Sequence, residues 1–378
     1  MHSTHTKLSA TVAKFLKFCS ILGLSFIILV ACNNNSLEPQ NGLIDKSGYI
    51  VSSQEVLSLC SNLLIPTNNS IKSGRVTLEK RKVKNIKNIP DENGNDVYYV
   101  VNFEEGGFII ISGDRRTDPV LAHSLTGEFK FEGKPFPSGL ISWLSSTKDY
   151  VKYVRKNSDK FAVNEKAWKE ETIEKIVGNF SKKSQRISSE PVDPPNGCND
   201  ILTVVNPLIS TNWGQGVGYN NETTLTGCSS YSNGHAPTGC VATAMAQVMN
   251  FYRRPYQYSW DNMQPNNTAL TTLMKDIGTQ VGMVYGCDGS SASTEDEVAS
   301  SFVGDFQYTS AQFSSYNHST VISELNNNKP VILRGGSQSG WWIFSTYVNG
   351  HAWVCDGYRQ YYFCDSGTTY LHLHMNWG

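Results

Sequence analysis

Charge and long apolar runs are both scarce in this chain of 378 residues. Charged residues make up 17% of the chain, below the ~25% of an average globular protein, and the formal net charge is -1. Nothing in this balance indicates the basic surface by which proteins bind nucleic acid. The apolar run at residues 18–31 is shorter than the ~20 residues that a membrane-spanning helix needs. We therefore expect neither a nucleic-acid partner nor a spanning helix.

The N-terminal segment has the pattern of an export signal. Lysines precede the apolar run, which predicts a signal peptide over residues 1–31. The run ends in Leu29-Val30-Ala31-Cys32, which resembles the lipobox of bacterial lipoproteins and predicts acylation of Cys32, with a polar tether over residues 32–45. We expect a lipid anchor in the bacterial cell envelope, at the outer membrane, periplasmic or surface face; the pattern also leaves open secretion of the mature form. A simple secretory signal with an incidental cysteine is the alternative.

Residues 240–252 have the pattern of a buried helix that begins at a cysteine. Apolar residues recur from Val241 to Tyr252 at the spacing of one helix face, and Pro255 follows as a stop. Cys240 then occupies the first helical position, where the helix dipole favours a thiolate and lowers the cysteine pKa. This pattern predicts a nucleophile mounted on a rigid element.

The sequence predicts a strand around His351. Residues 351–356 alternate, with His351 and Trp353 on one face, which is the period of a β-strand. Asp356-Gly357 predicts a turn into a second apolar run at residues 361–364, so we expect His351 to open a β-hairpin. A histidine there can hold a nearby thiolate as an ion pair and later protonate a leaving amine.

Two further side chains complete the candidate site. Gln215 can donate to the oxyanion of a tetrahedral intermediate, and Asn376 can fix the tautomer of His351. Taken alone, a cysteine or a histidine is most often a structural residue of the core. The chain order Gln, Cys, His, Asn is that of papain-like cysteine peptidases, which favours a catalytic site, although the residues next to Cys240 do not match the papain signature.

Several segments resemble the streptopain family of bacterial cysteine peptidases. Residues 234–247 are similar to its nucleophile segment, residues 350–357 to its histidine strand, residues 376–378 to its asparagine–tryptophan segment, and Gln215-Gly216 to its oxyanion region. The resemblance implies a papain-like α+β domain over residues 191–378, in which a helix with the cysteine packs on an antiparallel sheet with the histidine.

The same resemblance implies a role for each residue. Cys240 is then the nucleophile, His351 the general base and Gln215 the oxyanion donor, while Asn376 and Trp377 orient the histidine. No metal and no cofactor are implied. The expected reaction is cleavage of peptide bonds in extracellular or host proteins through an acyl-enzyme.

Residues 46–190 form a different unit. Residues 96–103 and 107–112 predict a β-hairpin, and two helical patterns follow it. Residues 106–114 resemble the propeptide of streptopain-like zymogens, which covers the active site until it is cleaved. The resemblance implies an α+β propeptide that inhibits its own enzyme; an independent binding domain is the alternative.

The two ends of the predicted catalytic domain are unusual. A polar and then proline-rich linker at residues 181–197 is expected to be extended and open to proteases, so the mature enzyme should begin there. The chain stops at Gly378, whereas chains of the resembled family continue. This suggests a domain truncated at its C-terminus, with Asn376 and Trp377 frayed and activity reduced.

The remaining cysteines allow two further interpretations. Cys355 and Cys364 would span the predicted hairpin as a disulfide if the envelope is oxidising. The same two cysteines with His372 and His374 invite a zinc site, but their spacing matches no common zinc pattern.

These observations predict a cysteine endopeptidase made as a zymogen. Its expected partners are protein or peptide substrates, its own propeptide, and the membrane. Two alternatives remain: a Cys-His cell-wall amidase, and a non-catalytic lipoprotein that retains the fold for binding or inhibition.

Overall fold

The computed structural model describes residues 48–66, 78–132, 136–178, 198–292, 296–339 and 346–378. All of these residues belong to one compact unit, Leu43–Gly378. The predicted signal peptide, the tether with Cys32, and the whole linker at 181–197 lie outside them. In the described part of the chain, no helix is both long and apolar enough to cross a membrane.

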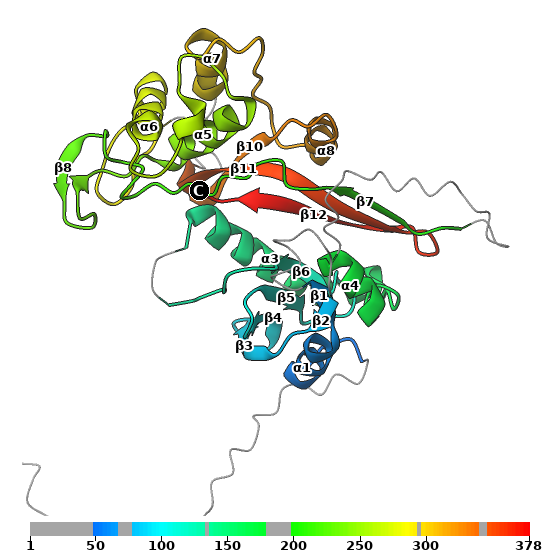
Figure 1. Ribbon diagram of the computed structural model, residues 1–378. Coiled ribbons are helices and arrows are strands. Elements are labelled where there is room, and N and C mark those ends of the chain that lie inside the picture. Colours follow the sequence, from blue (N-terminus) through cyan, green and yellow to red (C-terminus); the bar gives the residue numbers. More distant parts are fainter. Residues whose placement is uncertain (1–47, 67–77, 133–135, 179–197, 293–295, 340–345) are drawn as a thin grey trace, which may run out of the picture. The chain divides into compact units, whose positions relative to one another are not determined.

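The N-terminal part of this unit is a four-stranded antiparallel sheet in the order β3-β4-β5-β6 (Figure 1). Its strands are β3 (Val83–Pro90), β4 (Asp96–Phe103), β5 (Phe108–Ser112) and β6 (Val120–Ser124). The pairing of β4 with β5 confirms the predicted hairpin. A small second sheet joins β1 (Leu64–Pro66) to β2 (Leu78–Lys80).

Helices pack on both faces of this sheet, and β4 is therefore buried on both sides. Tyr99 shares one core cluster with Val56 and Ile173, while its neighbour Val100 shares another with Val151. The helices are α1 (Ser53–Asn62), α3 (Ser138–Lys156), the short η1 (Ser158–Lys160) and α4 (Glu170–Gly178). The α+β character predicted for this region is therefore confirmed.

The C-terminal part is built around one long strand, β11 (Thr346–Phe363). Three strands pair with it in antiparallel fashion: β10 (Val331–Ser339), β12 (Thr368–Asn376) and β7 (Ile201–Val205). The other elements are β8 (Leu225–Cys228), β9 (Gly234–His235), α5 (Cys240–Tyr252), η2 (Trp260–Asn262), α6 (Thr268–Gln280), α7 (Asp296–Gly304) and α8 (His318–Asn326). Helix α5 contacts both α6 and β11. The predicted cysteine helix thus packs on the predicted histidine strand (Figure 1).

The turn predicted at Asp356-Gly357 is wrong. Strand β11 runs through both residues, and the turn into β12 falls at residues 364–367. A Cβ at position 357 would lie 2.8 Å from the carbonyl oxygen of Val205 in β7. This glycine therefore marks a close approach of two backbones, which the local sequence cannot distinguish from a turn.

The disulfide predicted between Cys355 and Cys364 is also wrong. Cys364 pairs with Cys198, and a second disulfide joins Cys228 to Cys287. Cys355 is a free thiol, buried in the apolar cluster that β11 forms with α8 and β12. Because β11 continues past Gly357 to Phe363, Cys355 lies within the strand and Cys364 follows its end, so the two do not face each other across a hairpin.

The residues considered as zinc ligands have other partners. His374 Nδ1 lies 2.6 Å from a carboxylate oxygen of Asp356. His372 Nε2 donates to the carbonyl of Val120 at 2.6 Å and lies 3.1 Å from Asp118. Among the residues described here, no group of three or more His, Cys, Asp or Glu side chains is arranged to hold a metal ion.

Candidate active site

The helix that carries the candidate nucleophile begins at Cys240, as predicted. Gly239 precedes it with φ +85°, and a Cβ there would lie 2.8 Å from the Met283 side chain and 3.0 Å from the carbonyl of Ser290. Only glycine fits this position. The helix differs from the predicted one-sided stripe, because residues 241–249 are all buried whereas Tyr252 is 37% exposed. Such a helix is held from every side.

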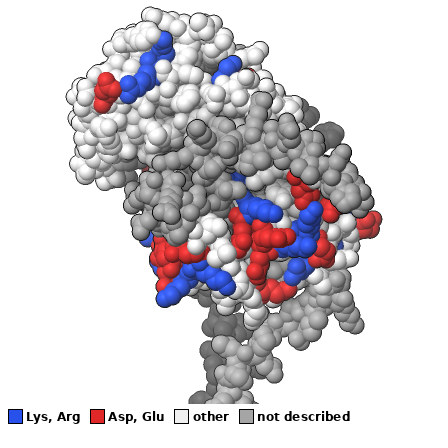
Figure 2. Space-filling view, turned by 45° about the vertical axis from the view of Figure 1, so that its right-hand side comes forward, with Lys and Arg blue, Asp and Glu red and all other residues white. Residues whose placement is uncertain are grey.

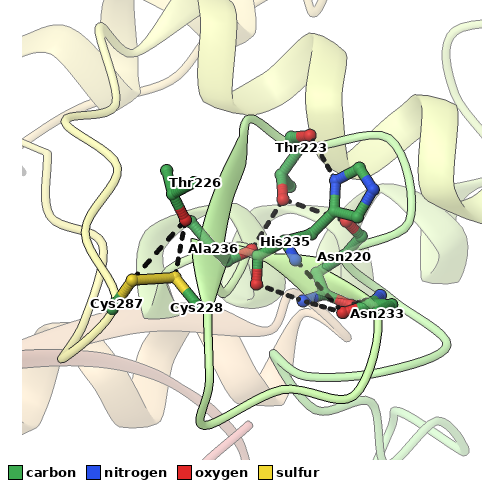
Figure 3. Close-up of a disulfide and its surroundings, with 8 residues drawn as sticks. All are labelled: Asn220, Thr223, Thr226, Cys228, Asn233, His235, Ala236 and Cys287. Atoms are coloured by element: carbon green, nitrogen blue, oxygen red, sulfur yellow. Dashed lines mark hydrogen bonds between the residues drawn. A yellow bond between two sulfur atoms is a disulfide. The ribbon is translucent and has the colours of Figure 1, made fainter.

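A small hairpin and a disulfide fix the chain just before this helix (Figure 3). The His235 ring donates from Nδ1 to the carbonyl of Thr223 at 2.6 Å, and the Thr223 hydroxyl donates to the carbonyl of Ala236 at 2.6 Å. The Cys228–Cys287 disulfide ties the hairpin to the loop that packs against the helix start. Hydrogen bonds and a disulfide therefore hold the chain segment that leads into Cys240.

His351 lies on β11 and is 8% exposed. Its Nε2 is 2.7 Å from the carbonyl oxygen of Trp377. Because a carbonyl only accepts, Nε2 carries the hydrogen and Nδ1 keeps its lone pair. The ring stacks on the indoles of Trp353 and Trp377, at centroid distances of 6.2 and 6.3 Å. Trp377 therefore fixes both the tautomer and the plane of the imidazole.

The sulfur of Cys240 contacts the backbone of the histidine strand, one residue after His351. The N–H of Ala352, the residue after His351, donates to Cys240 Sγ at 3.3 Å. Within the described residues, no hydrogen bond joins Sγ to either nitrogen of the imidazole. Both side chains line one large cavity of about 3100 Å³.

Burial dominates the protonation of both groups. It raises the pKa of the Cys240 thiol, against the opposing effect of backbone N–H groups such as that of Ala352. It lowers the pKa of His351, against the opposing hydrogen bond to Trp377. The low cysteine pKa expected from the helix dipole is therefore not what this arrangement shows: both shifts favour the neutral thiol and imidazole over an ion pair.

Helix α3 of the N-terminal part packs directly on the indoles beside His351. A Cβ at Gly139 would lie 2.9 Å from the Trp377 ring and 3.0 Å from the Trp353 ring. The Ser142 hydroxyl donates to the carbonyl of Gly336 in β10 at 3.4 Å. The same helix contributes to the wall of the cavity, so the candidate site lies under a segment of the chain's own N-terminal part.

Two family models match these two parts of the chain. Residues 213–259 and 255–378 match the Peptidase C10 family, and residues 50–151 match the Spi protease inhibitor. The match to the Peptidase C10 family and the similarity to streptopain support assignment to the streptopain family of cysteine peptidases. It is therefore a cysteine-type peptidase, a hydrolase, with a papain-like α+β peptidase domain preceded by an inhibitor-type α+β propeptide. Both the predicted fold class and the predicted enzyme class are confirmed.

Curated relatives and a solved structure extend over most of this C10 peptidase. Streptopain of Streptococcus pyogenes serotype M1 is 26% identical over 356 residues, covering 82% of this chain and 78% of that protein. The thiol protease/hemagglutinin PrtT of Porphyromonas gingivalis is 24% identical, covering 76% of this chain and 33% of that protein. A solved fragment of Prevotella intermedia prointerpain A aligns with a TM-score of 0.49 and 23% identity, covering 78% of this chain and 88% of the fragment.

Asn376 lies differently from expectation. The Asn376 side chain does not reach His351; it donates to the carbonyl of Thr211 at 2.7 Å and to Gln247 Oε1 at 3.0 Å. These contacts, and the pairing of Asn376 with Val354 in the sheet, anchor a segment that we expected to be frayed.

Gln215 lies in the loop before the hairpin. Its carbonyl accepts from the N–H of Thr238, two residues before Cys240, at 2.9 Å. Its partly buried side chain has no hydrogen-bond partner among the described residues. The backbone of Gln215 is therefore held near the helix start.

Sequence reasoning missed Gln247, which is 0% exposed on α5. Its signal was present: a polar residue inside a continuous apolar run, seven positions after Cys240 and so on the same helix face. A buried amide must have partners, and this one binds Asn376. The sequence contains no comparable pattern that would have predicted the contact of α3 with the indoles.

Proposed function

We propose that Cys240 is the nucleophile of this peptidase and His351 its general base. The observation that carries the proposal is the hydrogen bond from Ala352 N–H to Cys240 Sγ, 3.3 Å long, which brings the helix start to the histidine strand. The Trp377 carbonyl leaves Nδ1 of His351 free to take a proton. The orienting role predicted for Asn376 and Trp377 then belongs directly to Trp377.

The reaction proceeds in two halves. Nδ1 of His351 takes the thiol proton, Sγ of Cys240 attacks the scissile carbonyl carbon, and the proton passes to the leaving amine as the C–N bond breaks. A thioester remains. His351 then takes a proton from water, the hydroxide attacks the thioester, and Sγ leaves as thiolate to regain the proton.

Gln215 supplies one of the oxyanion donors in this proposal, with a backbone N–H at the start of α5 as the other. Removing one such donor costs about 10²–10³ in turnover. We therefore expect Gln215→Ala to lower kcat by that amount while the thermal midpoint stays unchanged, as measured by peptide hydrolysis and calorimetry. A loss smaller than tenfold would place the donor elsewhere.

The N-terminal domain keeps the enzyme inactive by covering the indoles that flank His351. Burial is the largest cause of both pKa shifts at the site. Removal of α3 admits water, which lowers the pKa of the thiol, raises that of the imidazole, and favours the ion pair. Release of the propeptide thus has two effects at once: it exposes the cleft, and it changes the protonation state of Cys240 and His351.

Gly139→Leu tests this contact. A side chain at position 139 overlaps the two indoles, and overpacking costs roughly 1–3 kcal/mol, so we expect the zymogen to open more often. The initial rate of Cys240 alkylation by iodoacetamide in the intact zymogen, followed by mass spectrometry, should rise about tenfold. Gly304→Leu, at an exposed helix end with open space around it, should leave the rate unchanged. An unchanged rate in Gly139→Leu would show that α3 does not restrict access.

The proposal places the enzyme in the bacterial cell envelope, anchored by acylated Cys32 or released as a secreted mature form. The export pattern before Cys32 supports this placement, and partition of Cys32→Ala into the aqueous phase of Triton X-114 would test it.

Figure 2 shows positive and negative side chains intermixed on the face drawn, without a large patch of one sign. The face drawn thus shows no basic patch of the kind that binds nucleic acid. We propose extracellular or host proteins as the substrates.

Parallel assays on casein and on bacterial cell walls test the proposed function. We expect the processed protein to cleave casein, to lose this activity after alkylation, and to leave the turbidity of cell walls unchanged. Clearing of cell walls without cleavage of casein would instead support the amidase. Reactivity of Cys240 with a thiol probe without turnover on either substrate would support the binding lipoprotein.

A further inference from the structure

The amide of Gln247 is completely buried on the nucleophile helix. It is 0% exposed and lies within a run of nine buried residues, 241–249. A buried polar side chain costs about 1–3 kcal/mol when it is unpaired, and an apolar side chain of similar size would fill the same volume without that cost. The hydrogen bonds of this amide therefore call for an explanation.

The amide joins three segments that are distant in sequence. Its Oε1 accepts from the Thr211 hydroxyl at 3.1 Å, the Trp213 backbone N–H at 3.2 Å and Asn376 Nδ2 at 3.0 Å. Its Nε2 lies 3.3 Å from Asn376 Oδ1. Asn376 also donates to the carbonyl of Thr211 at 2.7 Å. Both polar ends of Gln247 are thus satisfied.

Each of these segments continues into the candidate site. Trp213 precedes Gln215 by two residues. Asn376 is followed by Trp377, whose carbonyl and ring hold His351. The helix of Gln247 begins at Cys240. One side chain therefore links the elements that carry the nucleophile, the base and the oxyanion donor.

We propose that Gln247 is a positioning residue, which acts through Asn376 to hold Trp377, and with it His351, in register with Cys240. The inference rests on the roles proposed above for Cys240 and His351. A displacement of about 1 Å in such a support can cost about 10²-fold in rate. The amide serves alignment of the reacting groups rather than substrate binding.

Gln247→Met keeps the length of the side chain and removes all of its hydrogen bonds. We prepare it in the full chain and process it with immobilised wild-type enzyme, which is removed before the assay, so that maturation is not limiting. We expect kcat to fall about 10- to 100-fold with KM within threefold of wild type, and the pH profile of Cys240 alkylation to shift. Gln280→Met, an exposed glutamine at the end of α6, should match wild type. A normal kcat and alkylation profile, whatever the thermal midpoint, would overturn the inference.

A double-mutant cycle tests the route through Asn376. If both side chains act through one contact, Gln247→Met combined with Asn376→Ala should be no worse than the more damaged single variant. Additive losses would contradict the proposal.

Gln247→Glu provides a second variant if the methionine protein does not fold. The carboxylate keeps the acceptor but lacks the donor to Asn376 until it is protonated. The ratio of variant to wild-type kcat should therefore rise as the pH falls, and a ratio independent of pH would count against the inference. Cleavage by Cys240→Ser would refute the proposed function itself, whereas an inactive Cys240→Ser beside a fully active Gln247→Met would refute only the role of Gln247.

Discussion

Cys240→Ser is expected to abolish peptide cleavage, with a loss on the order of 10⁴-fold or more. A serine hydroxyl has a much higher pKa than a thiol, so it remains protonated where a thiol can ionise, and its proton passes far less readily to His351. The assay is casein cleavage by protein whose folding is confirmed by an unchanged thermal midpoint. Cys355→Ala, at the other free cysteine of the described catalytic part, should retain activity. Full activity in Cys240→Ser would refute the assignment of the nucleophile.

The same variant reports on maturation. If the enzyme cleaves its own linker, Cys240→Ser should stay at full length while the wild type acquires a new N-terminus near residue 190. N-terminal sequencing distinguishes the two forms. The same new N-terminus in the serine variant would identify an outside protease as the activator.

His351→Ala is expected to reduce kcat nearly as much as loss of the nucleophile, because it removes both the acceptor of the thiol proton and the donor to the leaving amine. The alkylation rate of Cys240 in the processed enzyme should then follow the ionisation of an unassisted thiol and lose the limb due to the imidazole. His318→Ala, an exposed histidine at the start of α8, is the matched control. Retention of the wild-type profile by His351→Ala would exclude it as the base.

Local sequence patterns predicted the two elements that carry this pair. The start of α5 at Cys240 follows from Gly239, whose φ of +85° ends the preceding extended chain, and from the apolar run after it. The strand through His351 follows from alternation over six residues. In both cases neighbours in sequence carry the information.

Contacts between distant segments were not predictable in this way. Gly357 was interpreted as a turn residue. It is a glycine because β7 approaches it closely, and β7 lies about 150 positions earlier in the chain, so no local pattern shows the contact. Asn376 was expected at His351, but its side chain reaches Gln247, 129 positions away. The pKa of Cys240 is raised by burial in the surrounding fold, which outweighs the opposing hydrogen bonds from backbone N–H groups.

The position of α3 is the clearest example of this limit. Its apolar pattern predicted a helix, and Val151 and Val154 are indeed fully buried. Nothing in that pattern showed that Gly139, on the same helix, would lie against Trp353 and Trp377. A glycine without local need for flexibility can mark a docking point for rings far along the chain.

The most direct test titrates casein cleavage against alkylation of Cys240 in the processed enzyme. Iodoacetamide is added in small steps, and mass spectrometry measures the label at each cysteine beside the residual activity. We predict that activity falls in proportion to the label on Cys240 and reaches zero when that thiol is fully modified. Cleavage that persists with Cys240 fully alkylated would contradict the account.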